Sequence, residues 1–100
     1  MQAEFITVTE YCIHHHTDAG FIEALEQSGL ITLTEEEEQR LIHYDQLKKL
    51  ESYIRWHNDL DINLEGIEAI RYLVDKVETM QTRIHQLEAK LRHYEQQPSE

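Results

Sequence analysis

The chain has 100 residues, one cysteine and a net charge of −11. This length allows one domain, or a small head with a helical extension, and leaves little room for an enzyme cleft. The single cysteine excludes an internal disulfide, and no apolar run is long enough for a membrane span or a signal peptide. We therefore expect a cytoplasmic protein that does not interact with membranes.

Negative charge is concentrated in the first half of the chain. Residues 1–47 contain ten acids and one base, a net charge of −9, whereas residues 48–100 have a net charge of −2. A surface of this kind repels nucleic acid and attracts a basic protein surface. The charge pattern therefore favours a protein partner and argues against nucleic acid.

Two short helices, each with an N-terminal cap, open the chain. Residues 7–10 fit a capping box and predict a helix over about 8–15. Asp18 offers a second cap and Gly29 suits the left-handed position after a helix, so the second helix should cover about 19–28. Two short helices joined by a tight turn indicate a helix-turn-helix.

A wing and a third helix are expected next. Leu30–Thr34 predicts a strand, Glu35–Glu38 the tip and Gln39–His43 the return strand of a hairpin. Four glutamates are poor turn formers, and the run is also compatible with the start of a helix. From Asp45 the pattern is helical again, and this helix should end near residues 58–61.

The last third of the chain carries an unbroken heptad pattern. Asn63 is placed to cap a helix that runs to Gln96, and Pro98 prevents its extension. Apolar residues recur at alternating spacings of three and four, as in the a and d positions of a coiled coil. This seam consists of Ile70, Leu73, Val77, Met80, Ile84, Leu87, Leu91 and Tyr94. A neighbouring apolar face, Leu64, Ile67 and Val74, is interpreted as the contact with the head.

The pattern predicts two parts, a winged helix-turn-helix head over residues 1–62 and a long coiled-coil helix over residues 63–100. Because the strict heptads persist past the head, we expect a homodimer formed through the seam. A parallel arrangement would pair Arg83 with Glu88 and Lys90 with Glu95 across the dimer.

The order helix, helix, wing, helix, long helix resembles the MerR-like winged-helix proteins. Within it, Phe5–His14, Gly29–Ile31 and Leu60–Ile67 look like the corresponding segments of the chaperone modulator family CbpM. The resemblance implies a mainly α fold, with a MerR-like winged helix-turn-helix, a small β-hairpin and a long C-terminal coiled-coil helix. It also implies binding to the J-domain of a DnaJ-like co-chaperone of the CbpA type, and its inhibition. Because the MerR-like resemblance argues for antiparallel helices, the orientation of the dimer stays open.

The acidic residues of the head are the candidate partner-binding residues. Glu23 and Glu26 lie one turn apart on the second helix and can share a face. The glutamate run either extends this face as a docking rim or is only a solvated charge run. The candidate set is Asp18, Glu23, Glu26, Glu35, Glu36, Glu37 and Glu38. Tyr11 or Phe21 could anchor the complex, although both also suit the core.

The sequence has no pattern typical of catalysis, cofactor binding or metal binding. Successive helical residues such as His14–His16 point about 100° apart, so they cannot close on one ion, and no CxxC or HxxxH pattern accompanies them. Cys12 lies on the apolar side of a short helix, as a small core residue would. We expect no enzyme, no cofactor and no metal site.

Two other functions are alternatives to a protein-binding modulator. A MerR-like transcriptional regulator would read DNA with the second helix, yet residues 19–28 offer only Gln27 for that role, beside Glu23 and Glu26. A bare coiled-coil adaptor would not need two capped head helices. We therefore favour the modulator and expect no specific DNA binding.

Overall fold

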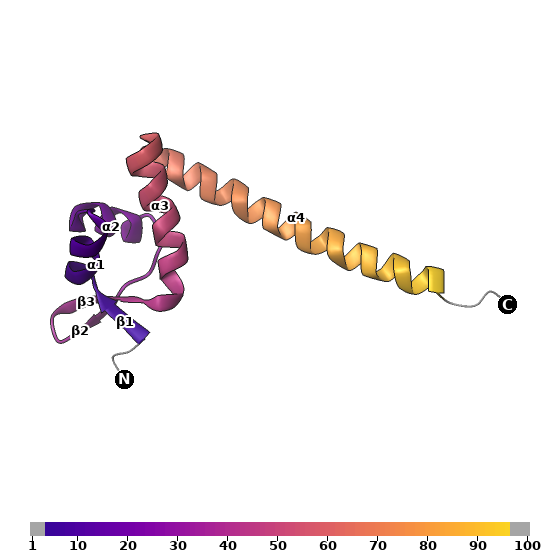
Figure 1. Ribbon diagram of the computed structural model, residues 1–100, viewed down its shortest axis with the longest axis horizontal. Helices are drawn as coiled ribbons and strands as arrows, with labels where there is room; N and C mark the ends of the chain where they lie inside the picture. Colours follow the sequence, from indigo (N-terminus) through magenta and orange to yellow (C-terminus); the bar gives the residue numbers. More distant parts are fainter. Residues whose placement is uncertain (1–3, 97–100) are drawn as a thin grey trace. The chain divides into compact units, whose positions relative to one another are not determined.

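The computed structural model describes residues 4–96, which form a small sheet and a series of helices (Figure 1). The elements in chain order are β1 (Phe5–Thr7), α1 (Val8–His15), α2 (Ala19–Gln27), β2 (Thr34–Glu36), β3 (Gln39–His43), the 3-10 helix η2 (Tyr44–Gln46), α3 (Leu47–Leu60) and α4 (Leu64–Gln96). The chain divides into two compact units, with the division inside α4 between Glu68 and Ala69. The predicted fold, mainly helical with a winged helix-turn-helix and a long last helix, is confirmed. The predicted stop at Pro98 lies outside the described residues.

Both helices of the helix-turn-helix begin at the predicted caps. Thr7 Oγ1 accepts a hydrogen bond from the Glu10 backbone N–H at 3.1 Å, and Asp18 Oδ1 accepts one from the Phe21 N–H at 2.8 Å. These bonds satisfy amide groups that the first turn of a helix leaves free. α1 covers the predicted residues, and α2 ends at Gln27, one residue earlier than expected.

The first strand of the wing begins later than the apolar run predicts. β2 covers only Thr34–Glu36, so Glu35 and Glu36 lie in the strand and not at the tip. Residues 30–33 form a loop. The prediction of a strand over Leu30–Thr34 is therefore wrong for all but its last residue.

Hydrogen bonds at the end of α2 explain this loop. The Leu30 N–H donates to the Leu25 carbonyl and the Gly29 N–H to the Glu26 carbonyl, both at 2.9 Å, and Gly29 has a φ of 80°. This is the Schellman motif that ends many helices. The Leu30 carbonyl then accepts a hydrogen bond from the Tyr53 hydroxyl at 3.2 Å. Because these groups are already satisfied, this part of the backbone needs no partner strand.

β3 is the central strand of an antiparallel sheet with the order β1-β3-β2. Its Leu41 is paired with Thr7 of β1 on one side and with Thr34 of β2 on the other. The hairpin tip is formed by Glu37 and Glu38, whose φ angles of 51° and 65° are both positive, as in a type I′ turn. The predicted hairpin is thus present with a shorter first strand, and β1 adds a third strand.

The core of the first unit is formed by α1, α2, α3, β3 and the first turn of α4. Its largest fully buried side chains are Tyr11, Tyr53, Ile22, Leu25, Ile42, Leu50 and Ile67. Cys12 and Phe21 are half-buried against this cluster, in agreement with the core role predicted for Cys12. The Phe21 ring also stacks on His57, with 4.4 Å between the ring centroids. Tyr11 and Phe21 are therefore both committed to the core.

Asn63 caps α4, as predicted. The Gly66 N–H donates to Asn63 Oδ1 at 2.8 Å. A Cβ atom added at Gly66 would lie 2.6 Å from Ile62 Cγ2, so the glycine allows Ile62 to close over the first turn. Ile67 is fully buried, which fits a hydrophobic staple with Ile62.

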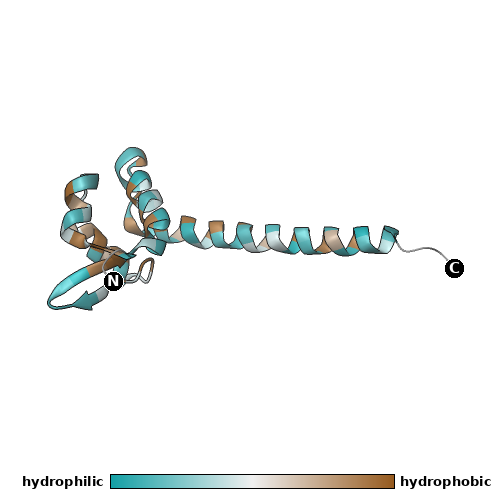
Figure 2. Ribbon diagram, turned by 60° about the horizontal axis from the view of Figure 1, so that its bottom comes forward, coloured by the Kyte–Doolittle hydropathy of each residue, from teal (hydrophilic) through white to brown (hydrophobic). Residues whose placement is uncertain are grey.

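The second unit consists of α4 from Ala69 onward, and its apolar seam is exposed. Figure 2 shows hydrophobic and hydrophilic residues alternating along this helix. The exposed fraction of the seam residues after Ile70 runs from 47% at Leu87 to 77% at Tyr94. Among residues 4–96, no helix combines the length and apolar character needed to cross a membrane.

Candidate partner-binding groove

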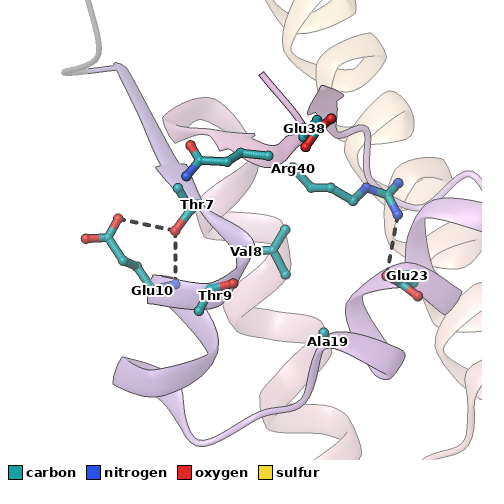
Figure 3. Close-up of a pocket in the computed structure, with 9 residues that line it drawn as sticks. Thr7, Val8, Thr9, Glu10, Ala19, Glu23, Glu38 and Arg40 are labelled. Carbon is teal, nitrogen blue, oxygen red and sulfur yellow. Dashed lines mark hydrogen bonds and ion pairs between the residues drawn. The ribbon is translucent and has the colours of Figure 1, made fainter. Parts of the chain in front are cut away.

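A groove of about 630 Å³ lies between the helix-turn-helix and the wing (Figure 3). It is formed by the junction of β1 with α1, the first half of α2 and the start of β3. The lining residues are Thr7, Val8, Thr9, Glu10, Ala19, Glu23, Glu38, Gln39 and Arg40. The groove therefore combines a small apolar floor, Val8 and Ala19, with a mainly acidic edge.

Glu10 is positioned in this groove by the cap of α1. Thr7 Oγ1 holds the Glu10 backbone N–H, and the Glu10 carboxylate accepts a hydrogen bond from the Thr7 hydroxyl at 3.3 Å. Thr7 is itself fixed by its pairing with Leu41 in the sheet. Glu10 was not among the predicted binding residues. Its place at the end of a capping box was the signal that could have located it at the helix start.

Arg40 connects the wing to α2. Its guanidinium lies 3.5 Å from the Glu23 carboxylate and donates a hydrogen bond to Glu26. Figure 3 shows the side chain reaching toward Glu23. Glu23 and Glu26 therefore share one face of α2, as predicted. Arg40, which was not among the candidate binding residues, offsets part of their negative charge. The signal was available, because Arg40 is the only base among residues 1–47.

Of the other predicted acids, only Glu38 lines the groove. Asp18 is engaged as the cap of α2, while Glu35 and Glu36 lie in β2 and Glu37 lies in the turn. The four glutamates are exposed, and within residues 4–96 their side chains form no hydrogen bond or ion pair. The structure thus does not gather the whole predicted set at one site.

The groove and its edge carry more negative than positive charge. The acids here are Glu10, Glu23, Glu26 and Glu38. Arg40 is the single base beside them. Carboxylates in this arrangement attract a basic helix or peptide and repel the phosphates of nucleic acid. The charge of the groove is therefore complementary to that of a basic helix or peptide.

The Cys12 thiol lies half-buried against the core of the first unit. Burial, together with the nearby charge of Asp18, raises the pKa of this thiol. A raised pKa disfavours the thiolate form on which nucleophilic catalysis depends. In the described part of the chain, no group of three His, Cys, Asp or Glu side chains lies close enough together to hold a metal ion.

The comparisons with known proteins bear on this arrangement. Neither the curated proteins nor the solved structures yielded a match. The family described as "MerR HTH family regulatory protein" matches residues 6–89. The match covers the helix-turn-helix, the wing, α3 and most of α4. The chain therefore belongs to the MerR HTH family of regulatory proteins.

Proposed function

We propose that this chain is a non-enzymatic chaperone modulator that binds the J-domain of a DnaJ-like co-chaperone of the CbpA type and inhibits its stimulation of DnaK. The resemblance of Phe5–His14, Gly29–Ile31 and Leu60–Ile67 to the CbpM family suggests this partner. The observation that carries the proposal is the acidic groove, which lies where a DNA-reading head would need basic side chains.

The mechanism is occlusion. J-domains stimulate DnaK through a basic helix and the adjoining His-Pro-Asp loop. Glu10, Glu23 and Glu38 would attract that helix and raise the rate of association, since complementary charges act mainly on encounter and specificity. A J-domain helix that is covered in this way cannot contact DnaK, so stimulation falls without a covalent step.

The test is a DnaK ATPase assay in which the chain is titrated against a stimulating J-domain. Stimulation should disappear at saturation, and binding should weaken steeply with salt. Glu10→Gln with Glu38→Gln removes two groove charges that Arg40 does not contact, and should weaken binding about tenfold. The matched control is Glu65→Gln with Glu68→Gln, which removes the same charge outside the groove. If the J-domain still stimulated the DnaK ATPase fully at a saturating concentration of the chain, the proposal would be overturned.

A DNA-binding transcriptional regulator is the alternative function, and membership of the MerR HTH family favours it. Against it, α2 presents Glu23 and Glu26, both next to Arg40, and only Gln27 is suited to contact a base edge. A gel-shift experiment at low salt separates the two functions. Tight binding to a specific sequence would favour the regulator over the modulator.

We also propose that the chain forms a homodimer through the seam of α4. The support is a helix of 33 residues whose a and d positions after Ile70 remain exposed. Pairing with a second copy would bury this stripe, and in a parallel pair Arg83 would meet Glu88 and Lys90 would meet Glu95. Two heads in one particle would present two acidic grooves.

A further inference from the structure

α1 exposes a large apolar side chain, that of Ile13, to solvent. The side chain is 68% exposed, more than any other large apolar side chain within residues 4–68. The other exposed ones in this range are Leu60, at 62%, and Tyr44, at 51%, and neither lies on an element that lines the acidic groove. Because single exposed apolar side chains are common on protein surfaces, exposure alone does not indicate a binding site. Ile13 is distinguished by its position on α1.

Ile13 lies one helical turn after two residues that line the groove, Thr9 and Glu10. Residues three and four positions apart share one face of a helix, and helical side chains lean toward its N-terminal end. Ile13 therefore extends toward Thr9 and Glu10, which Figure 3 shows beside the cap of α1. The other side of α1 is turned to the core, where Val8 and Tyr11 are buried. The groove and Ile13 thus form one continuous surface along α1.

This surface changes from charged to apolar along its length. At the groove end lie the carboxylates of Glu10, which the Thr7 hydroxyl holds in place, and of Glu38 from the wing. At the other end lies Ile13. A ligand that covers both ends must carry positive charge at one point and an apolar group about 5–6 Å away, the distance between neighbours on one helix face. An amphipathic helix with an apolar residue one turn from a lysine or arginine has this pattern.

We propose that Ile13 is the apolar anchor of the groove, and that the surface binds a basic amphipathic helix whose apolar residue covers this side chain. The inference rests on the function proposed above, in which the J-domain supplies the basic helix. It replaces the predicted anchors Tyr11 and Phe21, which the core already holds. Charges at an interface act mainly on the rate of association, whereas a buried apolar contact acts on the rate of dissociation. The roles of Ile13 and of the carboxylates are therefore separable by kinetics.

The test measures the association and dissociation rates of the J-domain on the full chain by surface plasmon resonance at two salt concentrations. Ile13→Ala should raise the dissociation rate at least about tenfold, because burial of the isoleucine side chain is lost, and should leave the association rate within about twofold. Ile13→Leu keeps an apolar side chain of the same size and should dissociate as slowly as the unmodified chain. Glu10→Gln with Glu38→Gln should mainly lower the association rate and its dependence on salt.

Leu60→Ala is the matched control, because it removes an apolar side chain of similar exposure from α3. It should leave both rates unchanged, and a rise in its dissociation rate equal to that of Ile13→Ala would overturn the anchor. An unchanged dissociation rate in Ile13→Ala would also overturn the anchor, while the proposed function would stand. If the unmodified chain did not bind the J-domain at all, both would be overturned.

Urea unfolding separates the anchor from a role of Ile13 in folding. Because the side chain is exposed and alanine is the better helix former, Ile13→Ala should unfold at the same urea concentration as the unmodified chain or at a higher one. A lower midpoint would mean that Ile13 packs within the folded chain itself, and the anchor would be overturned.

Discussion

The Arg40 guanidinium lies 3.5 Å from the Glu23 carboxylate, which ties the wing to α2. The two side chains are 35% and 48% exposed, so water screens the attraction. We expect Arg40→Gln to lower the free energy of unfolding by about 1 kcal/mol or less, and the loss to shrink in high salt. Urea unfolding at two salt concentrations measures this. Arg92→Gln, at an exposed site on α4, is the control for the loss of a positive charge alone. A loss of unfolding free energy in Arg40→Gln that does not depend on salt would contradict an ion pair between Arg40 and Glu23.

The wing turn should be easy to stabilise. Glu37 and Glu38 both have positive φ, a conformation that costs a non-glycine residue about 1–2 kcal/mol. Glu37→Asn with Glu38→Gly supplies the residues that type I′ turns prefer and should raise the free energy of unfolding by about 1 kcal/mol. The control Glu35→Asn with Glu36→Gly removes the same charge from β2 and should give no gain. Thermal unfolding of the two variants checks the difference.

Gly66→Ala should destabilise the chain, although alanine is the better helix former. The new Cβ would meet Ile62 Cγ2 at 2.6 Å, and relieving such overpacking costs about 1–3 kcal/mol. In an Ile62→Ala background the same change should cost less, because Ile62 Cγ2 is gone and Asn63 Oδ1, at 3.2 Å, is the closest atom that remains. A double-mutant cycle in urea measures this coupling. Equal effects of Gly66→Ala in both backgrounds would show that the contact is not the cause.

Tyr11 should make stability fall at alkaline pH. Its folded-state pKa of about 12 exceeds the ordinary value of 10.0, so the folded chain binds this proton more tightly than the unfolded chain. The resulting stability is complete below pH 10 and is lost as the pH rises toward 12. Urea midpoints across this window should fall less in Tyr11→Phe than in the unmodified chain. Parallel curves would exclude Tyr11 as the group responsible.

The prediction of a dimer formed through the seam can be tested with two variants. One places a carboxylate in the seam, and the other places it on the outward face of the helix. Ile84→Asp places a carboxylate at an a position and should convert a dimer into a monomer. His85→Asp places it at the neighbouring outward position and should leave the dimer intact. Light scattering gives the mass of each variant. An unchanged dimer with Ile84→Asp would show that this seam is not the interface.

The parts of the fold that the sequence predicts well are those determined by residues close together in the chain. Thr7, Asp18 and Asn63 each accept a hydrogen bond from an amide three residues later, so the cap and its helix stand in one short stretch of sequence. The same locality explains why the bounds of α1 and the start of α4 needed little correction.

The parts that failed depend on distant residues. The Leu30 carbonyl is satisfied by a hydroxyl 23 positions away on Tyr53, and the Glu26 carboxylate by Arg40, 14 positions away. In the composition of residues 1–47, Arg40 appears only as a single base beside ten acids. Its contact with Glu23 follows from the return of β3 toward α2, which a pattern of single residues does not contain.

Thr7 belongs to two elements at once. It is the last residue of β1, paired with Leu41 of the central strand, and its side chain caps α1. Separating β1 from β3 therefore releases the residue that holds the first turn of α1. The sheet edge and the helix start form one cooperative unit, whose amide protons exchange with solvent through a common opening.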